Sequence, residues 1–326
     1  MKRRDFCLTG GGFIACLATG RIFPRRSQKS RPSRVILVKT DNRALGVRRC
    51  LEIWGTNPCK GKNVLIKPNF NTADPFPGST HNDTLKAILS RVREMQVASV
   101  SIGDRSGPQD TEEVLKQKNI HSLASEFDAE VINFDALNKD EYEKINRPGF
   151  HWRDGFLAAR PVTEAECLIQ TCCLKTHQYG GVFTMSLKNS VGIVPRKDYP
   201  FMRELHSSSH QRKMIAEINT AYKPDLVILD GIEAFVDGGP MTGEKKQANV
   251  FLAGEDRVAI DAAAVAILKE LGSNDAIMKT PVFEQEQISR AAELKLGAGS
   301  PSGISIETDD KAGKEYADKI QEILFG

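Results

Sequence analysis

The segment 173–198, CLKTHQYGGVFTMSLKNSVGIVPRKD, gathers side chains that could bind an anion and act on it. Its cations, imidazole and amide stand around glycines, and they are Lys175, His177, Lys188, Asn189 and Arg196. The segment contains one carboxylate, at position 198, so a ligand carboxylate or phosphate could supply the missing negative charge. Backbone N–H groups at the start of a helix predicted around Lys188 would add to such an anion site. The alternative interpretation is a solvated basic loop.

His177 could serve as a general acid or base, as a metal ligand, or as a structural histidine. It precedes Gly180 and Gly181, whose backbone can approach a ligand closely because glycine has no side chain. Lys175 and Lys188 would then bind the charge of the substrate. The residue pattern specifies neither a metal nor a cofactor.

Further polar residues follow the other apolar runs, where strands of the predicted sheet would end. They are Lys67, Asn69, Asp104 and Asp230. In open α/β sheets ligands bind beyond the carboxyl ends of the strands, so these residues should converge with Lys175 and His177. We expect Asp104 or Asp230 to orient His177, and Lys67 to hold an anionic group. Simple turn chemistry in GDRSG and an exposed lysine at a strand end are the alternatives for Asp104 and Lys67.

Four more residues are candidates for binding. His81 closes the loop sequence PGSTH, and Arg203 precedes a histidine pair, His206 and His210, in which the spacing is four residues. That spacing would place both imidazoles on one helix face, but the intervening SSS predicts that a helix starts between them, so a shared metal is disfavoured. Asp261 lies in the first turns of an apolar helix and would either cap a helix or line a pocket.

Short apolar runs alternate with helical patterns along the chain, which predicts an α/β fold with a Rossmann-like, mostly parallel sheet and helices on both faces. The expected strands are 35–40, 63–69, 98–104, 129–135, 167–174, 224–231 and 249–254. The first of them form a β-α-β-α-β half, and 136–162 is a β-rich excursion. The fold would occupy 35–326, with two possible lobes at 35–135 and 160–326.

The first 34 residues differ from the rest in charge. They contain nine Lys or Arg and one acid, whereas the remaining chain has 36 basic and 41 acidic residues. The net charge of −5 on that remaining chain argues against a nucleic-acid partner.

Arg3-Arg4 before Asp5-Phe6 and a short glycine-rich apolar run predict a signal for the twin-arginine export machinery, and therefore a periplasmic or exported protein. A disordered basic tail is the alternative. The run is too short for a membrane span, so none is expected in the mature body. FIAC, which ends at Cys16, leaves a lipid anchor open, and 21–34 is a basic linker.

Five cysteines lie outside this leader, and no C-x-x-C motif indicates a zinc ribbon or a ferredoxin-type cluster. Cys50 and Cys59 could pair in an oxidising compartment. Cys167, Cys172 and Cys173 lie in an apolar run and are expected in the core.

The order of several motifs resembles the domain of unknown function 362 family. They are VLIKPNF, PGSTH, SIGD, LKTH, SLKNSVGIVP, LVILDGIEAFVDGGPMTG and EDRVAIDAAA. The resemblance covers about 35–270 and implies an α/β domain of unassigned role, with some relatives associated with iron–sulfur modules. A fainter resemblance to the lactate racemase family rests on His177, Gly180-Gly181, Lys188 and Pro195.

Two functions remain open at this point. The first is an exported enzyme that acts on a small anionic substrate. The second is a non-catalytic periplasmic protein that binds or handles an anion, a metal or an iron–sulfur related cofactor in the same cleft.

Overall fold

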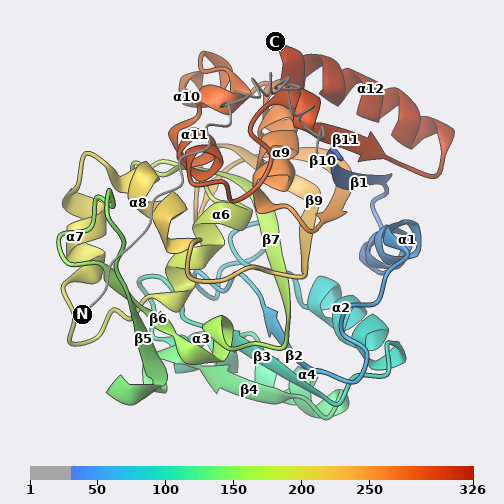
Figure 1. Ribbon diagram of the computed structural model, residues 1–326. Coiled ribbons are helices and arrows are strands. Elements are labelled where there is room, and N and C mark those ends of the chain that lie inside the picture. The colour runs from blue at the N-terminus through green and yellow to red at the C-terminus, as the bar shows by residue number, and fades with distance from the viewer. Residues whose placement is uncertain (1–30) are drawn as a thin grey trace, which may run out of the picture. The chain divides into compact units, whose positions relative to one another are not determined.

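The computed structural model describes residues 31–326, and Pro32–Gly326 form one compact unit. The predicted twin-arginine signal and Cys16 lie outside the described residues. Figure 1 shows a central sheet surrounded by helices. None of the helices in residues 31–326 combines the length and apolar character that a membrane crossing requires.

The central sheet has nine strands and is mixed but mostly parallel, which confirms the predicted α/β class. Eight of them follow the order β11-β1-β10-β9-β7-β2-β3-β4, and β8 pairs with β7. β10 runs antiparallel to both of its neighbours, β1 and β9, and β8 is antiparallel to β7, whereas the other neighbours pair in parallel. The bounds are β1 (Ser33–Lys39), β2 (Asn63–Lys67), β3 (Ser99–Asp104), β4 (Glu130–Asn133), β7 (Cys167–His177), β8 (Val182–Phe183), β9 (Leu226–Gly238), β10 (Gly243–Gly254) and β11 (Ile304–Glu307).

The predicted β-rich excursion is a separate two-stranded antiparallel sheet of β5 (Tyr142–Ile145) and β6 (Phe156–Ala159). Twelve α-helices complete the described part of the chain. They are α1 (Arg43–Trp54), α2 (Asn82–Glu94), α3 (Thr111–Gln117), α4 (Ile120–Glu126), α5 (Arg160–Thr163), α6 (Ser186–Asn189), α7 (Phe201–Ser207), α8 (Gln211–Ile218), α9 (Arg257–Leu271), α10 (Asp275–Met278), α11 (Glu286–Glu293) and α12 (Lys311–Phe325).

Helices cover both faces of the sheet because successive strand residues point to opposite sides. In β10, Val250 and Leu252 pack with α9, α11 and α12, whereas Phe251 and Ala253 pack with α1 to α4. Every residue of β7 is buried, as expected for a central strand of a sheet that is covered on both faces.

The strand order of the sheet differs from the one that the sequence predicted for its first strands. β1 is adjacent to β10 and β11, and β10, β9 and β7 lie between it and β2, so the first three predicted strands do not form a contiguous half-sheet. Strands from 35–135 and from 160–326 join in the one sheet.

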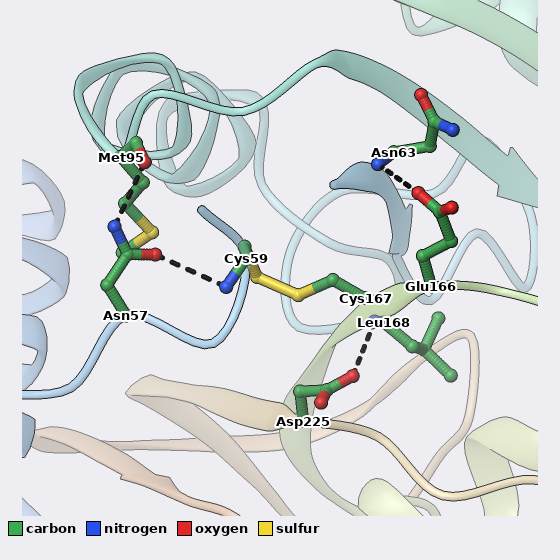
Figure 2. The surroundings of a disulfide bond; sticks show 8 residues. All are labelled: Asn57, Cys59, Asn63, Met95, Glu166, Cys167, Leu168 and Asp225. Carbon is green, nitrogen blue, oxygen red and sulfur yellow. Dashed lines mark hydrogen bonds between the residues drawn. A yellow bond between two sulfur atoms is a disulfide. The ribbon is translucent and has the colours of Figure 1, made fainter. Parts of the chain in front are cut away.

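A disulfide links Cys59, in the loop before β2, to Cys167, the first residue of β7 (Figure 2). The sequence left open whether Cys50 and Cys59 pair, and the structure pairs Cys59 with Cys167 instead, because the central strand brings Cys167 to the loop across 108 residues of chain. Backbone N–H groups on either side are also fixed, since Leu168 donates to Asp225 and Asn63 donates to Glu166 (Figure 2). Cys50, Cys172 and Cys173 are buried free thiols within residues 31–326.

Candidate functional site

Lys67, the last residue of β2, is held inside the protein by a buried polar network. Its Nζ lies 2.6 Å from Oδ1 of Asp104 and 2.8 Å from Oδ1 of Asn189. Asp104 is the last residue of the neighbouring strand β3, and its second oxygen accepts a hydrogen bond from the N–H of Phe70. The parallel strands β2 and β3 thus bring Lys67 and Asp104 together, as the sequence predicted. The Lys67 ammonium is occupied by these protein partners.

Next to this network lies a cavity of about 40 Å³, a size that suits only a small ligand. Its lining comes from the loop after β2, from the turn after β3 and from the segment around α6. The polar residues of this lining are Asn69, Asn71, Asp104, Arg105, Thr184, Lys188 and Asn189.

Four buried polar atoms of the cavity residues have no hydrogen-bond partner within the described part of the chain. They are Oδ1 of Asn69, Nδ2 of Asn71, Nε of Arg105 and Oγ1 of Thr184. Buried polar groups are nearly always paired, and each unpaired one costs about 1–3 kcal/mol. Their concentration at one cavity points to a ligand that would satisfy them.

Lys188, on α6, borders the same cavity and is partly buried. Its Nζ makes no hydrogen bond or ion pair with any of residues 31–326, in contrast to Lys67. Burial is the main cause that lowers the pKa of Lys188 to about 7, and the positive charges of Lys175 and Arg105 add to the effect. The amine is therefore uncharged in a large share of molecules near neutral pH.

His177 lies beside Lys188. It is the last residue of β7, and β8 folds back on it as a hairpin with Gly180 and Gly181 in the turn. A β-carbon placed on Gly181 would be 2.8 Å from Cε of Lys188 and 2.9 Å from Nδ1 of His177, so these two atoms flank the same glycine. Close approach is thus the reason that glycine stands at position 181.

The imidazole of His177 is buried, and its Nδ1 has no partner within residues 31–326. Burial, followed by the positive charges of Lys188 and Lys175, lowers the pKa of His177 far below its usual range, so the ring is neutral at physiological pH. Among residues 31–326 no carboxylate orients it, because Asp104 is bonded to Lys67 and Asp230 binds Arg43 and Thr84. The predicted carboxylate–histidine pair is therefore wrong.

Asp230 lies within β9 rather than at its end, because that strand continues to Gly238 and pairs with β10. Its carboxylate accepts hydrogen bonds from Nε of Arg43 at 2.9 Å and from the hydroxyl of Thr84. Burial raises the pKa of Asp230. His81 is placed near this group and caps α2 by accepting a hydrogen bond from the N–H of Asp83.

Lys175 is also committed to the fold. Its Nζ donates to the carbonyl of Gly78 at 2.5 Å and to that of Pro240 at 3.3 Å. The side chain therefore fastens the loop after β2 to the loop between β9 and β10, and burial lowers its pKa to about 8. Lys175 contributes charge to the surroundings of His177 and Lys188 without facing the cavity.

The remaining predicted binding residues lie apart from the cavity or are paired. Arg196 forms an ion pair with Asp135 at 2.8 Å, so its guanidinium has an acid that the local sequence did not reveal. Arg203 is exposed and lines a separate surface hollow with Glu204. Asn189 holds Lys67 and donates to the carbonyl of Thr171.

The two histidines with four-residue spacing contact different residues. His206, on α7, pairs with Gln211, and the ring of His210 packs on that of His151 with centroids 4.5 Å apart. A new helix, α8, starts at Gln211, directly after His210 and slightly later than the sequence predicted. Groups of three or more metal-ligating side chains do not occur in residues 31–326.

The start of α6 is not a ligand site, contrary to the expectation from the sequence. Asp261 of α9 accepts hydrogen bonds there from the N–H groups of Ser186 and Leu187, at 2.7 and 2.8 Å. This carboxylate thus caps a helix, one of the two roles that its position suggested. Burial raises the pKa of Asp261 to about 7.

Sequence reasoning missed Asn71 and Thr184 as cavity residues and left Arg105 outside the site. Asn71 stands two positions after Asn69 in the same loop, so that spacing could have indicated it. Thr184 reaches the cavity only because the N–H of Thr184 bonds to the carbonyl of Lys175 after the hairpin, which no local pattern reveals.

Comparisons with known proteins identify the family of this chain. The chain is 26% identical over 259 residues to the thylakoid-associated protein sll1697 of Synechocystis, covering 76% of this chain and 75% of that protein. The lactate racemase apoprotein of Thermoanaerobacterium thermosaccharolyticum is structurally similar with a TM-score of 0.44 and 16% identity, covering 87% of this chain and 85% of that one. The family described as domain of unknown function (DUF362) matches residues 64–266, and the chain belongs to this family.

Proposed function

We propose that this protein is an enzyme that binds a small anionic substrate in the cavity beside Lys188. The observation that carries the proposal is the set of unpaired buried atoms at that cavity. Nδ2 of Asn71, Nε of Arg105 and the hydroxyl of Thr184 are donors that find no acceptor among residues 31–326. A carboxylate or phosphate group would supply acceptor oxygens to all three.

The charge of the cavity supports an anion. Asp104 is neutralised by Lys67, and Arg105 contributes the remaining charge of the lining, together with Lys188 in those molecules in which its amine is protonated. Arg105 is held by its other nitrogens, which donate to the carbonyls of Ser106 and Val191, so its free Nε has a fixed direction. Oδ1 of Asn69, an unpaired acceptor, would take a hydroxyl or N–H of the same ligand.

His177 would move a proton in this proposal. A neutral imidazole with an unpaired nitrogen can accept or relay a proton from a bound ligand. Its strongly lowered pKa makes it a weak base, so its contribution would depend on a substrate proton that is acidified on binding.

The alternative is a non-catalytic protein that binds an anion or handles a cofactor in the same cavity. The lack of a carboxylate oriented toward His177 favours this alternative, since general bases are commonly oriented by one. Both functions predict binding, and only the first predicts turnover.

Binding is tested by thermal shift of the purified protein against small carboxylates and phosphates. Lys188→Met should abolish the ligand-induced shift, and Lys197→Met should keep it because Lys197 is exposed and pairs only weakly with Asp110 at 3.4 Å. A ligand that binds is then followed by NMR for conversion. Conversion that His177→Gln abolishes would support the enzyme, and tight binding without conversion would support the alternative.

We also propose export through the twin-arginine machinery into the periplasm. Arg3-Arg4 near the start of the chain supports this location, as does the disulfide between Cys59 and Cys167, since such bonds persist mainly in oxidising compartments. Replacement of Arg3-Arg4 by Lys-Lys should retain the protein in the cytoplasm, which cell fractionation would reveal. Labelling with a radioactive fatty acid tests the lipid anchor at Cys16.

A further inference from the structure

We propose that the side-chain amine of Lys188 attacks the carbonyl carbon of an anionic aldehyde or ketone and forms an imine with it. This inference rests on the proposed anion site and adds a covalent role and a substrate class to it. In the step a C=N bond forms, the C=O bond breaks, and the carbonyl oxygen leaves as water with the two protons that the amine loses, so nothing is oxidised or reduced.

The free state of the amine is the first observation. Three lysines are gathered in this region, and two of them have their Nζ atoms fixed by protein oxygens. Lys67 is fixed by Asp104 and Asn189, and Lys175 is fixed by two carbonyl groups. Lys188 alone of these three has no partner within residues 31–326, although it is partly buried and borders a cavity. A lysine with a purely structural role would be more stable with a hydrogen-bond acceptor for its amine, whereas the amine of Lys188 is free to react with a ligand.

Burial, and after it the positive charges around Lys188, favour the uncharged, nucleophilic form of its amine. Lys175 from β7 and Arg105 from the turn after β3 are cationic and disfavour a further ammonium ion. His177 and His206 face it from β7 and α7, and the pKa of each is lowered by burial and by Lys188 itself. The one carboxylate that lines the cavity, Asp104, is bonded to Lys67. A free amine in a desolvated, cationic setting is the usual form of an imine-forming lysine.

The cavity selects the substrate class. Its unpaired donors on Asn71, Arg105 and Thr184 would hold an oxyanion, and Lys188 borders the same small space. A ligand that binds the unpaired donors and also reaches the amine of Lys188 must carry its carbonyl within a few bonds of its anionic group. Short oxo acids and short aldehyde phosphates share this chemistry.

Reductive trapping tests the proposal. The full chain is incubated with glyoxylate in one arm and with glycolaldehyde phosphate in the other, reduced with borohydride, and analysed by intact mass and peptide mapping. We expect one adduct per chain, located on Lys188, with a yield that rises severalfold from pH 6 to pH 8. A higher yield with glyoxylate identifies a carboxylate as the preferred anionic group, and a higher yield with glycolaldehyde phosphate identifies a phosphate. Acetate or inorganic phosphate, which lack a reactive carbonyl, should lower the yield.

Matched variants separate the site from general lysine chemistry. Lys188→Met should lose the adduct while it keeps a cooperative thermal transition, and Lys197→Met should keep the adduct. Absence of any adduct, or equal labelling of the wild type and Lys188→Met, would overturn the proposal. If acetate or phosphate still raises the melting temperature in that case, the anion site stands and only the imine is rejected. If neither binding nor trapping occurs, the proposed function fails as well.

Discussion

The ammonium of Lys67 lies 2.6 Å from a carboxylate oxygen of Asp104, and both side chains are buried at the ends of adjacent parallel strands. Asp104 lines the cavity, and so does Asn189 of α6, which accepts a hydrogen bond from Lys67. The polar atoms of this pair have partners, whereas polar atoms of Asn69, Asn71, Arg105 and Thr184 have none within the described part of the chain. The cavity therefore has both paired and unpaired polar groups in its lining.

Loss of one partner of this pair should destabilise the protein strongly. Lys67→Met leaves the Asp104 carboxylate buried without its counter-charge, which costs about 3–5 kcal/mol in comparable cases. We expect a decrease of that size in the free energy of unfolding, measured by urea denaturation. Lys197→Met, at an exposed pair, should change it by less than about 0.5 kcal/mol. Adding Asp104→Asn to Lys67→Met should recover part of the loss, and strictly additive losses would contradict the pairing.

The disulfide between Cys59 and Cys167 should contribute measurably to stability. It closes a loop of 108 residues, and a loop of that length restricts the unfolded chain by about 4–5 kcal/mol in the chain-entropy description. Cys59→Ser should therefore lower the melting temperature and make it insensitive to reductant. Cys50→Ala serves as the control because Cys50 is a free thiol, and its variant should keep the sensitivity to reductant. A wild-type melting temperature unchanged by dithiothreitol would contradict the prediction.

The parts of the site that sequence predicted are those that depend on local pattern. Lys67 and Asp104 end apolar runs, and parallel strands bring their ends to one edge, so their proximity followed from strand prediction alone. Asp230 also follows an apolar run, LVIL, but its strand continues because the next residues pair with β10. The polar residue after the run therefore lies in mid-strand, and its partners come from α1 and α2.

Pairings across long sequence separations could not be predicted. Asp261 caps α6 from 75 residues away, and Arg196 finds Asp135 from 61 residues away. Both partners are brought together by the packing of helices and loops over the sheet, which leaves no trace in local spacing. The segment 173–198 looked unpaired for this reason. Of its three candidate cations, Lys175, Lys188 and Arg196, only Lys188 has no partner within residues 31–326.

The stability of the protein should reveal the cost of that free lysine. Its pKa of about 7 in the folded state lies below the ordinary value of 10.5, so the unfolded chain binds more protons between these values. The burial of Lys188 therefore costs no stability above pH 10.5, where the amine is neutral in both states. The cost grows as the pH falls and is complete below about pH 7. Lys188→Met should stabilise the protein by about 1–2 kcal/mol at pH 6.5, after allowance for solvent screening, and by less at pH 9. Urea denaturation at both pH values measures the difference, and a destabilised variant at pH 6.5 would contradict it.

The absence of a side chain at Gly181 should be needed for the positions of Lys188 and His177. A methyl group there would lie 2.8 Å from Cε of Lys188 and 2.9 Å from Nδ1 of His177, which is closer than real contacts allow. Gly181→Ala should therefore displace one of these side chains and reduce ligand affinity at least tenfold, because groups that contact a bound ligand tolerate little misplacement. Its effect on the free energy of unfolding should stay near 1–3 kcal/mol, as for other overpacked positions.

Gly299→Ala is the matched control, since a β-carbon at Gly299 meets nothing within 4 Å. Isothermal titration with the ligand found by thermal shift measures the affinity. Equal affinity for both variants would place the ligand away from His177 and Lys188.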